Sequence, residues 1–230
     1  MKMKQKFLAG AIALSALVSA AVIPAANAAE VGASVSAANM YYWRGLDLGS
    51  GDPAIIGDIN VSESGFYAGL WASSGDAGMG TEWDFYAGYG FEAGPVSVDL
   101  NYTTYMYPSA AEPVGFNDLS DVAVTLGFAA SDELSFKAMY RHGLSDLGDV
   151  DYSYATLSAS YNAVTLLVGM HSDDKVKAGA GSYDELTHVD LSYAYNDNLS
   201  FTLGKVIDDV DDTFNDEVKF IVTLSLPLGE

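Results

Sequence analysis

The chain has 230 residues, no cysteine, and 31 acidic against 10 basic side chains, which gives a net charge of −21. Half of the residues are hydrophobic and only 18% are charged. The acidic balance excludes nucleic acid as a partner, because phosphate binding needs clustered basic residues. A chain without cysteine has no disulfide framework, no cysteine nucleophile and no thiolate metal site.

The first 28 residues have the features of a secretory signal peptide. Three lysines among the first six residues precede an apolar stretch, residues 7–23, and Ala26-Asn27-Ala28 is a small-residue cleavage site. A transmembrane anchor is the alternative, but Pro24 ends the apolar run before any stop-transfer pattern. We therefore predict that residues 1–28 are removed. Residues 29–230 are left as one exported domain with seven basic against 31 acidic side chains, a net charge of −24.

Beyond the predicted signal, apolar and polar residues alternate as in a β-strand with two different faces. In the segment 82–92, for example, Trp83 and Phe85 share one phase while Glu82 and Asp84 occupy the other. A tilted strand needs about nine to eleven residues to cross a membrane, and no apolar run here is long enough for a spanning helix. About twelve segments of suitable length are predicted, at residues 31–44, 54–62, 66–74, 82–92, 95–107, 119–130, 133–143, 151–161, 163–172, 185–196, 198–207 and 216–227.

The connections between these segments alternate strictly between short and long. Short ones lie at residues 63–65, 93–94, 131–132, 162 and 197, and long polar ones at 45–53, 75–81, 108–118, 144–150, 173–184 and 208–215. This pattern is typical of an outer-membrane β-barrel, which has short periplasmic turns and longer outer loops. A soluble Greek-key sandwich has no reason to keep every second connection tight.

Aromatic residues near the strand ends fit the two aromatic girdles of such a barrel. They are Tyr41, Trp43, Phe66, Trp83, Phe91, Phe128, Phe136, Tyr193 and Phe220. The alternative is that they form the core of a soluble barrel, but a closed interior of this size could not hold so many large rings. The sequence therefore predicts an all-β transmembrane antiparallel barrel of about twelve strands, located in the outer membrane.

The polar phase of the predicted strands faces the lumen. Its charged members are Arg44 on the first strand, Asp58, Glu82, Asp84, Asp99, Lys137, Arg141, Asp190 and Lys219, accompanied by Asn60, Asn101 and His188. Two interpretations remain open. A charged constriction would select ions or small solutes by sign, whereas paired opposite charges would simply fill a narrow barrel.

The outer loops are acidic, most densely in the run of Asp208, Asp209, Asp211 and Asp212, followed by Asp216 and Glu217. Oxygen ligands at this spacing could hold Ca²⁺, but the run lacks the glycine-punctuated twelve-residue loop of a calcium site. A solvated acidic loop is favoured, and no metal or other cofactor is predicted. Such a rim attracts cations and repels anions at modest salt.

An enzyme is not predicted. His171-Ser172-Asp173 is contiguous, but adjacent strand residues point to opposite faces, so the signal for a hydrolytic triad is poor. Glu82 and Asp84 share a face and could act as acid and base. Lumen-facing charge explains both without catalysis.

Several ordered motifs resemble the TorF-type porin family. They are Asn39 with Trp43-Arg44-Gly45, the run 64–69 with Trp71-Ala72-Ser73, the set Glu82, Asp84, Tyr86, Gly88 and Tyr89, and finally Tyr105-Met106-Tyr107-Pro108. The resemblance covers residues 39–108, while the C-terminal half matches only in its alternation. It implies an outer-membrane barrel with a pore and names no substrate.

We therefore expect a passive outer-membrane channel for small solutes or ions, preferring cations, with lipid as its surroundings and a monomer favoured. Glu82, Asp84 and Asp99 are expected to face Arg44, Lys137 and Arg141 across the lumen. The alternative is a structural or binding barrel with a filled lumen and acidic ligand-binding loops. A third hypothesis, an outer-membrane hydrolase, would require His171 or His188 for turnover.

Overall fold

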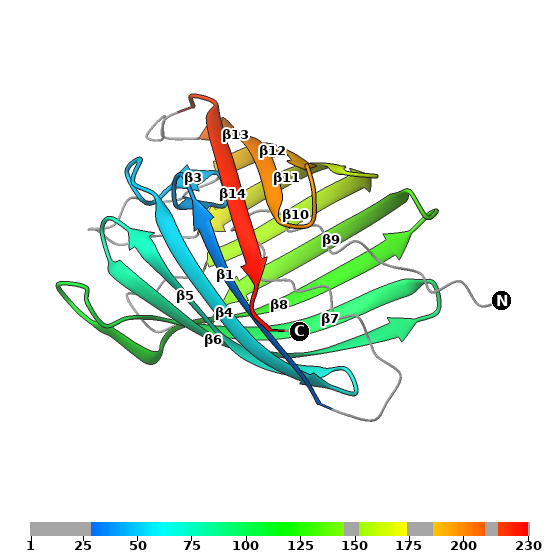
Figure 1. Cartoon of the computed structure of the whole chain (residues 1–230), viewed down its shortest axis with the longest axis horizontal. Coiled ribbons are helices and arrows are strands. Elements are labelled where there is room, and N and C mark those ends of the chain that lie inside the picture. The colour runs from blue at the N-terminus through cyan, green and yellow to red at the C-terminus, as the bar shows by residue number, and fades with distance from the viewer. Residues whose placement is uncertain (1–28, 145–151, 174–185, 210–215, 230) are drawn as a thin grey trace.

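The computed structural model describes residues 29–144, 152–173, 186–209 and 216–229, which form a closed antiparallel β-barrel (Figure 1). Twelve strands pair in chain order, and β1 closes the ring by pairing with both β14 and β4. The barrel strands are β1 (Glu30–Ala38), β4 (Ala54–Glu63), β5 (Phe66–Asp76), β6 (Gly80–Ala93), β7 (Val96–Tyr107), β8 (Val114–Ala129), β9 (Leu134–Gly143), β10 (Tyr152–Tyr161), β11 (Val164–Asp173), β12 (Leu186–Ala194), β13 (Leu199–Asp209) and β14 (Lys219–Pro227). The predicted fold is confirmed.

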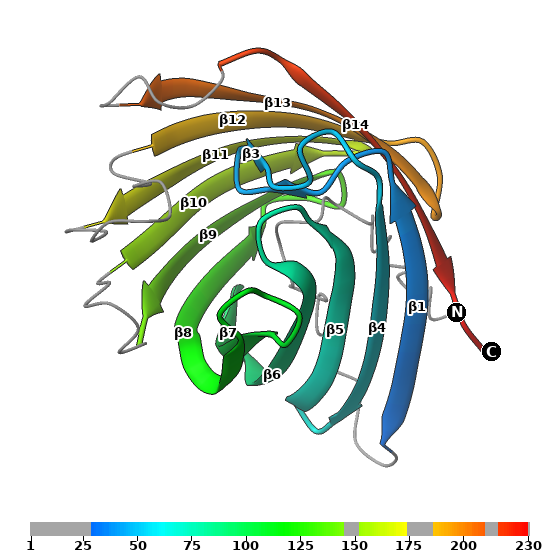
Figure 2. The same cartoon turned by 90° about the vertical axis from the view of Figure 1, so that its left-hand side faces the viewer.

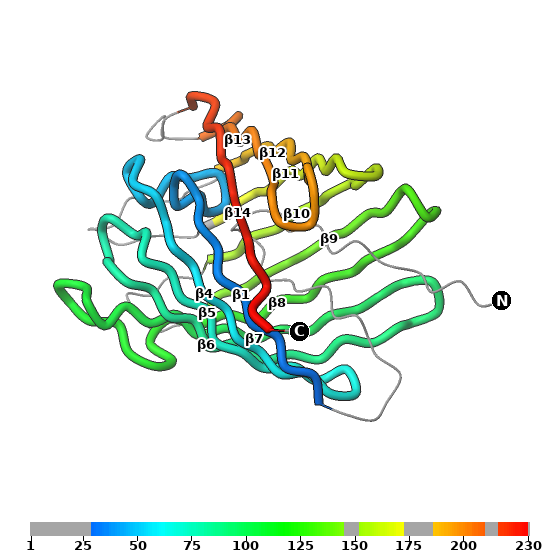
Figure 3. Tube along the Cα trace, viewed as in Figure 1, coloured from blue at the N-terminus to red at the C-terminus, as the bar shows by residue number. Residues whose placement is uncertain are grey.

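Tight turns gather at the end of the barrel where β1 begins and β14 ends (Figure 3). Ser64 and Gly65 join β4 to β5 with φ values of 52° and 89°. Two successive residues with positive φ form the type I′ turn, whose twist matches that of the flanking strands. We call this the turn end of the barrel and the opposite end the outer end.

The two faces of the barrel wall differ as the alternation predicts. Large apolar side chains are exposed on the outside, including Val124, Leu126, Phe128, Leu157, Leu166, Leu191, Leu203 and Leu224. Polar and charged side chains are buried inside, including Glu82, Asp84, Asp121, Arg141, His188 and Asp190. A continuous apolar exterior of this kind is costly in water and favourable in hydrocarbon.

The first predicted strand is wrong beyond Ala38. Residues 39–53 leave the wall and fold into the lumen, where β2 (Tyr42–Trp43) and β3 (Leu46–Asp47) form a small separate sheet (Figure 2). Tyr41 and Trp43 continue the alternating pattern of the first strand, so the pattern predicts that this strand extends to Arg44. In the folded chain Tyr41 is only 1% exposed and belongs to the lumen, not to an aromatic girdle.

Two outer connections are shorter than predicted. The hairpin of β5 and β6 continues to the pair Asp76↔Gly80, so residues 77–79 replace the expected loop 75–81. The Asp76 carboxylate accepts the backbone N–H groups of Gly78 at 2.8 Å and Met79 at 2.6 Å, which stabilises this tight turn. Likewise β8 begins at Val114, inside the predicted loop 108–118.

The described residues include no helix that is long and apolar enough to cross a membrane. The predicted signal peptide, residues 1–28, lies outside the described residues. The same holds for Asp211 and Asp212 of the acidic run.

We predict that a charge on the outer face destabilises the barrel more than the same charge one residue further along. Leu157 is 62% exposed on the outside of β10, whereas Ser158 faces the lumen. Leu157→Arg should lower the free energy of unfolding by about 2–4 kcal/mol if it enters the hydrocarbon, and Ser158→Arg by less than about 1 kcal/mol. Urea unfolding in lipid vesicles measures both, and equal losses would contradict an outer face in lipid.

Candidate functional site

The inward segment, residues 39–53, begins at a fixed point on the barrel wall. The Asn39 side chain donates to the Phe220 carbonyl at 2.9 Å and accepts from the Val222 backbone N–H at 2.7 Å. Its own N–H donates to the Val222 carbonyl at 3.2 Å. Asn39 therefore extends the β1–β14 pairing at the point where the chain turns into the lumen.

Within the segment, Arg44 and Gly45 form the hairpin turn between β2 and β3. Their φ values are 47° and 95°, and the paired residues on either side are Trp43 and Leu46. Gly45 suits this conformation, whereas an arginine in the left-handed region costs free energy. A Cβ on Gly45 would lie 2.8 Å from the Cβ of His188, so glycine also allows the turn to approach β12 closely.

Three polar groups of the inward segment contact three buried acids of the wall. The Tyr41 hydroxyl donates to Glu82 on β6, and the Tyr42 hydroxyl donates to Asp190 on β12 at 2.5 Å. Arg44 Nη2 lies 3.9 Å from Asp121 Oδ2 on β8. The segment is thus held on several sides of the lumen.

The Tyr41 phenol remains a hydrogen-bond donor. Burial, followed by the negative charge of Glu82, raises the pKa of the Tyr41 hydroxyl well above its usual value. The proton therefore stays on the phenol oxygen over the physiological pH range, and the contact with Glu82 is a phenol-to-carboxylate hydrogen bond.

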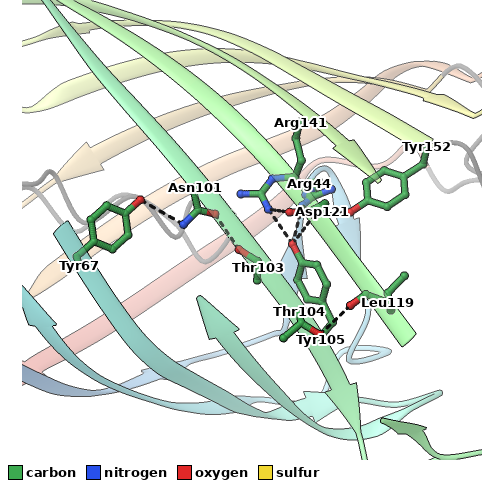
Figure 4. Close-up of polar contacts among 10 residues, drawn as sticks. All are labelled: Arg44, Tyr67, Asn101, Thr103, Thr104, Tyr105, Leu119, Asp121, Arg141 and Tyr152. Atoms are coloured by element: carbon green, nitrogen blue, oxygen red, sulfur yellow. Dashed lines mark hydrogen bonds and ion pairs between the residues drawn. The ribbon is translucent and has the colours of Figure 1, made fainter. Parts of the chain in front are cut away.

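Asp121 is the centre of the polar network shown in Figure 4. Its side chain is fully buried, and it accepts hydrogen bonds from Tyr105 at 2.8 Å, from Tyr152 and from Arg141 Nη1. Arg141 Nη1 also contacts the Tyr105 hydroxyl at 3.0 Å. Neighbouring strands supply these groups, so barrel pairing fixes their positions.

Two histidines connect the inward segment to the opposite part of the wall. His171 Nε2 lies 3.0 Å from the Arg44 carbonyl and donates to it. His188 lies 3.1 Å from Asp190 through Nδ1 and 2.8 Å from the Tyr154 hydroxyl through Nε2. Because a carboxylate accepts, Nδ1 donates to Asp190 and Nε2 accepts from the Tyr154 hydroxyl.

Apolar packing supports these polar contacts. Tyr41 joins a buried cluster with Ala54, Ile56, Trp71 and Tyr86, and its ring centroid lies 6.3 Å from that of Trp71. A second cluster joins Leu46 of the inward segment to Leu186 and Val206 of the wall. The segment is therefore packed as firmly as a protein core, and it narrows the outer half of the lumen.

The half of the lumen nearer the tight turns is less enclosed. Asp58 and Asp99 are half-buried there, and each accepts a tyrosine hydroxyl, from Tyr86 at 2.8 Å and from Tyr67 at 3.0 Å respectively. Lys137 is exposed in the same region. Solvent therefore reaches charged groups on this side of the inward segment.

Seven of the eight residues predicted for the constriction lie on the inner face of the wall: Asp58, Glu82, Asp84, Asp99, Lys137, Arg141 and Asp190. Arg44 lies in the lumen but on the inward segment, which corrects its predicted place on the first strand. The expected opposition of acids and bases across the lumen is also wrong for the wall residues. Strands β6 to β9 are consecutive neighbours, and Arg141 on β9 pairs with Asp121 on the adjacent β8.

Sequence reasoning missed Asp121 and the tyrosines that donate to it or lie beside it. Asp121 has the inward phase of the predicted segment 119–130, and Tyr105 and Tyr154 have the inward phase of theirs, so the signal was present. Tyrosine is ambiguous because it fits a lipid-facing girdle as well as a polar lumen. The histidine and serine of the 171–173 run do point apart, since His171 is 4% exposed inside while Ser172 is exposed.

The family model described as "Bacterial protein of unknown function (Gcw_chp)" matches residues 23–222, so the chain belongs to that family. No curated protein matches the chain. The solved NanC porin has a TM-score of 0.54 and 12% identity over 84% of this chain and 97% of its own. The KdgM porin has a TM-score of 0.49 and 10% identity over 87% of this chain and 99% of its own.

We predict that the inward segment can be loosened without touching a polar group. A Cβ on Gly204 of β13 would lie 2.0 Å from the Tyr42 hydroxyl, so Gly204→Ala should displace this hydroxyl from Asp190. Loss of one buried hydrogen bond costs about 1 kcal/mol. The population of molecules in which the inward segment is detached from the wall should therefore rise roughly fivefold. Trypsin cleavage after Arg44, followed by mass spectrometry, should accelerate to that extent.

Gly57→Ala is the matched control, because a Cβ at that position meets no atom within 4 Å. It should leave the cleavage rate after Arg44 unchanged. If both variants were cleaved at the wild-type rate, the Tyr42 contact would not hold the segment in the lumen.

Proposed function

We propose that this member of the Gcw_chp family is a porin-like channel of the Gram-negative outer membrane that passes small solutes or ions passively and prefers cations. The proposal includes export by the signal peptide, a monomer in lipid, and the TorF-type resemblance of residues 39–108. It assigns the chain no enzymatic activity, because transport through a barrel needs none.

The apolar outer face is the observation that supports a membrane location. Exposed leucine, valine and phenylalanine side chains occur on successive strands of the closed sheet. In hydrocarbon every backbone N–H and C=O must be paired, and a closed barrel meets this requirement. The porin likeness is consistent with the same location at the level of fold.

The polar lumen, solvated on one side of a narrow segment, is the observation that carries the channel proposal. A barrel of this size can hold more than side chains, since about eight strands already leave an interior that side chains just fill. The inward segment reduces the open cross-section of the outer half of the lumen. In the other half, Asp58, Asp99 and Lys137 remain accessible to solvent. A wide vestibule in series with a narrow stretch is a suitable form for a selective pore.

The charge of the lumen supports cation preference. Six acids of the wall face it, Asp58, Glu82, Asp84, Asp99, Asp121 and Asp190, against four bases, Arg44, Lys137, Arg141 and Lys219. Within a low-dielectric wall this excess raises the local concentration of cations. Acidic outer loops add to the same field at the mouth.

The alternative is a barrel with a filled lumen that serves as a structural or binding protein. The inward segment favours this function too, because Tyr41, Tyr42 and Arg44 are each at most 3% exposed. Such a barrel would bind its ligands, ions or surface polysaccharide, through the acidic loops and would not conduct.

We predict that the mature chain gives discrete, cation-selective conductance steps in a planar bilayer under a salt gradient. Asp58→Asn combined with Asp99→Asn removes two of the six lumen acids of the wall, so the reversal potential should fall by roughly half. Asp132→Asn combined with Glu133→Gln is the control, since it removes the same charge from an exposed turn. An unchanged reversal potential in the lumen variant would contradict the assigned selectivity.

Deletion of residues 40–50 separates the two functions. In a channel the deletion should raise the conductance several-fold, because it removes the narrow stretch and leaves the barrel pairing intact. A wild-type chain and a deletion variant that both insert, show heat-modifiable migration and never conduct would contradict the channel and favour the filled barrel.

A further inference from the structure

A cluster of residues on the wall of the lumen surrounds the Arg44 guanidinium, and we call it the Asp121 subsite. It consists of Tyr105, Asp121, Tyr152 and Tyr154 on the inner faces of β7, β8 and β10, and Arg141 of β9 lies at its edge, where Nη1 contacts Asp121 Oδ1 and the Tyr105 hydroxyl. Barrel pairing holds these residues in place, independently of the inward segment. The subsite is therefore formed before any occupant arrives.

The chemistry of the subsite matches a guanidinium group. A carboxylate and phenol oxygens accept N–H groups in the plane of a guanidinium, and aromatic rings contact its faces. The occupant in this structure is Arg44 of the inward segment. Its Cζ lies 4.7 Å from the ring centroid of Tyr154 and 4.3 Å from that of the neighbouring Trp43.

Arg44 occupies the subsite imperfectly. Its Nη2 is 3.9 Å from Asp121 Oδ2 and 3.4 Å from the Tyr105 hydroxyl, both longer than the roughly 2.7–2.9 Å of a good charge-assisted hydrogen bond. Its Nη1 is buried and has no hydrogen-bond partner. The backbone at Arg44 has a φ of 47°, which is unfavourable for a residue with a side chain.

These three features share one cause, because the guanidinium is tied to a tight hairpin turn. A free guanidinium carries no such restraint and can approach Asp121 Oδ2 more closely, while Arg141 keeps its contact with Oδ1. It would also replace Arg44 charge for charge, so the pair of Asp121 and Arg141 would see no change in net charge. Exchange is therefore electrostatically neutral and relieves the strained contact.

We propose that the Asp121 subsite recognises solutes bearing a guanidinium group and that such a solute displaces Arg44, which loosens the inward segment. This inference deepens the proposed function, on which it rests, by naming a class of organic cation for the pore. Arg44 acts as a tethered substitute for the solute. Tyr41 and Tyr42 keep the rest of the segment in place through Glu82 and Asp190 until Arg44 leaves.

Arg44→Ala provides the direct test, with methylguanidinium as the probe. The substitution lies outside the barrel strands, so the variant should fold, which heat-modifiable migration verifies. Calorimetric titration of the full mature chain in detergent should give saturable binding to Arg44→Ala about tenfold tighter than to the wild type, because no arginine competes. Methylammonium has the same charge without the planar fork and should bind about tenfold more weakly than methylguanidinium.

A wall variant keeps the test specific. Arg44→Ala combined with Tyr154→Leu retains Asp121 and removes the ring, and it should lose most of the methylguanidinium affinity. Equal affinity for methylguanidinium and methylammonium, or equal affinity with and without Tyr154, would overturn the inference. So would saturable binding to the wild type that matches the Arg44→Ala variant.

Bilayer recording separates this inference from the proposed function. Methylguanidinium added to the outer side should raise the open probability of the wild type about threefold over equal methylammonium and should leave Arg44→Ala unchanged. A channel that conducts but does not distinguish the two cations would overturn the displacement of Arg44. Specific binding by a chain whose variants never conduct would refute the pore and retain the subsite.

Discussion

The pairing of β1 with β14 is the constraint on which the rest of the structure depends. It closes the sheet, and it is a short seam, with five paired residues from Ser34↔Pro227 to Ala38↔Thr223. A sheet left open here would expose two edges, which hydrocarbon does not tolerate. Asn39 extends the seam by contacting Phe220 and Val222 just as the chain turns inward. Closure of the barrel and entry of the inward segment therefore depend on the same residue.

Alternation along the chain predicted the barrel well because each strand meets two different surroundings. The polar phase of β6, for instance, is set by Glu82 and Asp84, which the structure buries inside, while Trp83 and Phe85 remain exposed outside. A chain with this pattern that must pair all of its backbone N–H and C=O groups in lipid can adopt few folds other than a closed barrel. The strands could therefore be predicted from the residues of each segment alone.

The inward segment could not be predicted in the same way. Tyr41 and Trp43 continue the alternation of β1, and the pattern carries no information on whether a loop points outward or folds back. The decisive contacts join residues far apart in the chain, such as Tyr42 with Asp190 and Arg44 with Asp121. The remaining local signal is Gly45, whose positive φ marks a turn and ends the strand.

Tyrosine and glycine together explain how a narrow lumen can hold so many rings. A Cβ on Gly88 would lie 2.3 Å from the Tyr67 hydroxyl, and one on Gly204 would lie 2.0 Å from that of Tyr42. The rings therefore lie flat against stretches of bare backbone, with their hydroxyls directed to carboxylates. Flat rings occupy less of the cross-section than rings that stand away from the wall, and Asp58 and Asp99 remain only half-buried.

The same arrangement makes the lumen responsive to what enters it. Glu82, Asp121 and Asp190 already have donors from the inward segment, so a solute gains affinity only by replacing those donors. Asp84 lies beside Glu82, and one of its side-chain oxygens is buried without a hydrogen-bond partner. Selectivity in such a pore comes from competition with groups of the chain itself. In the pore proposed above, this competition would favour solutes that resemble the groups of the inward segment, which are cations and hydrogen-bond donors.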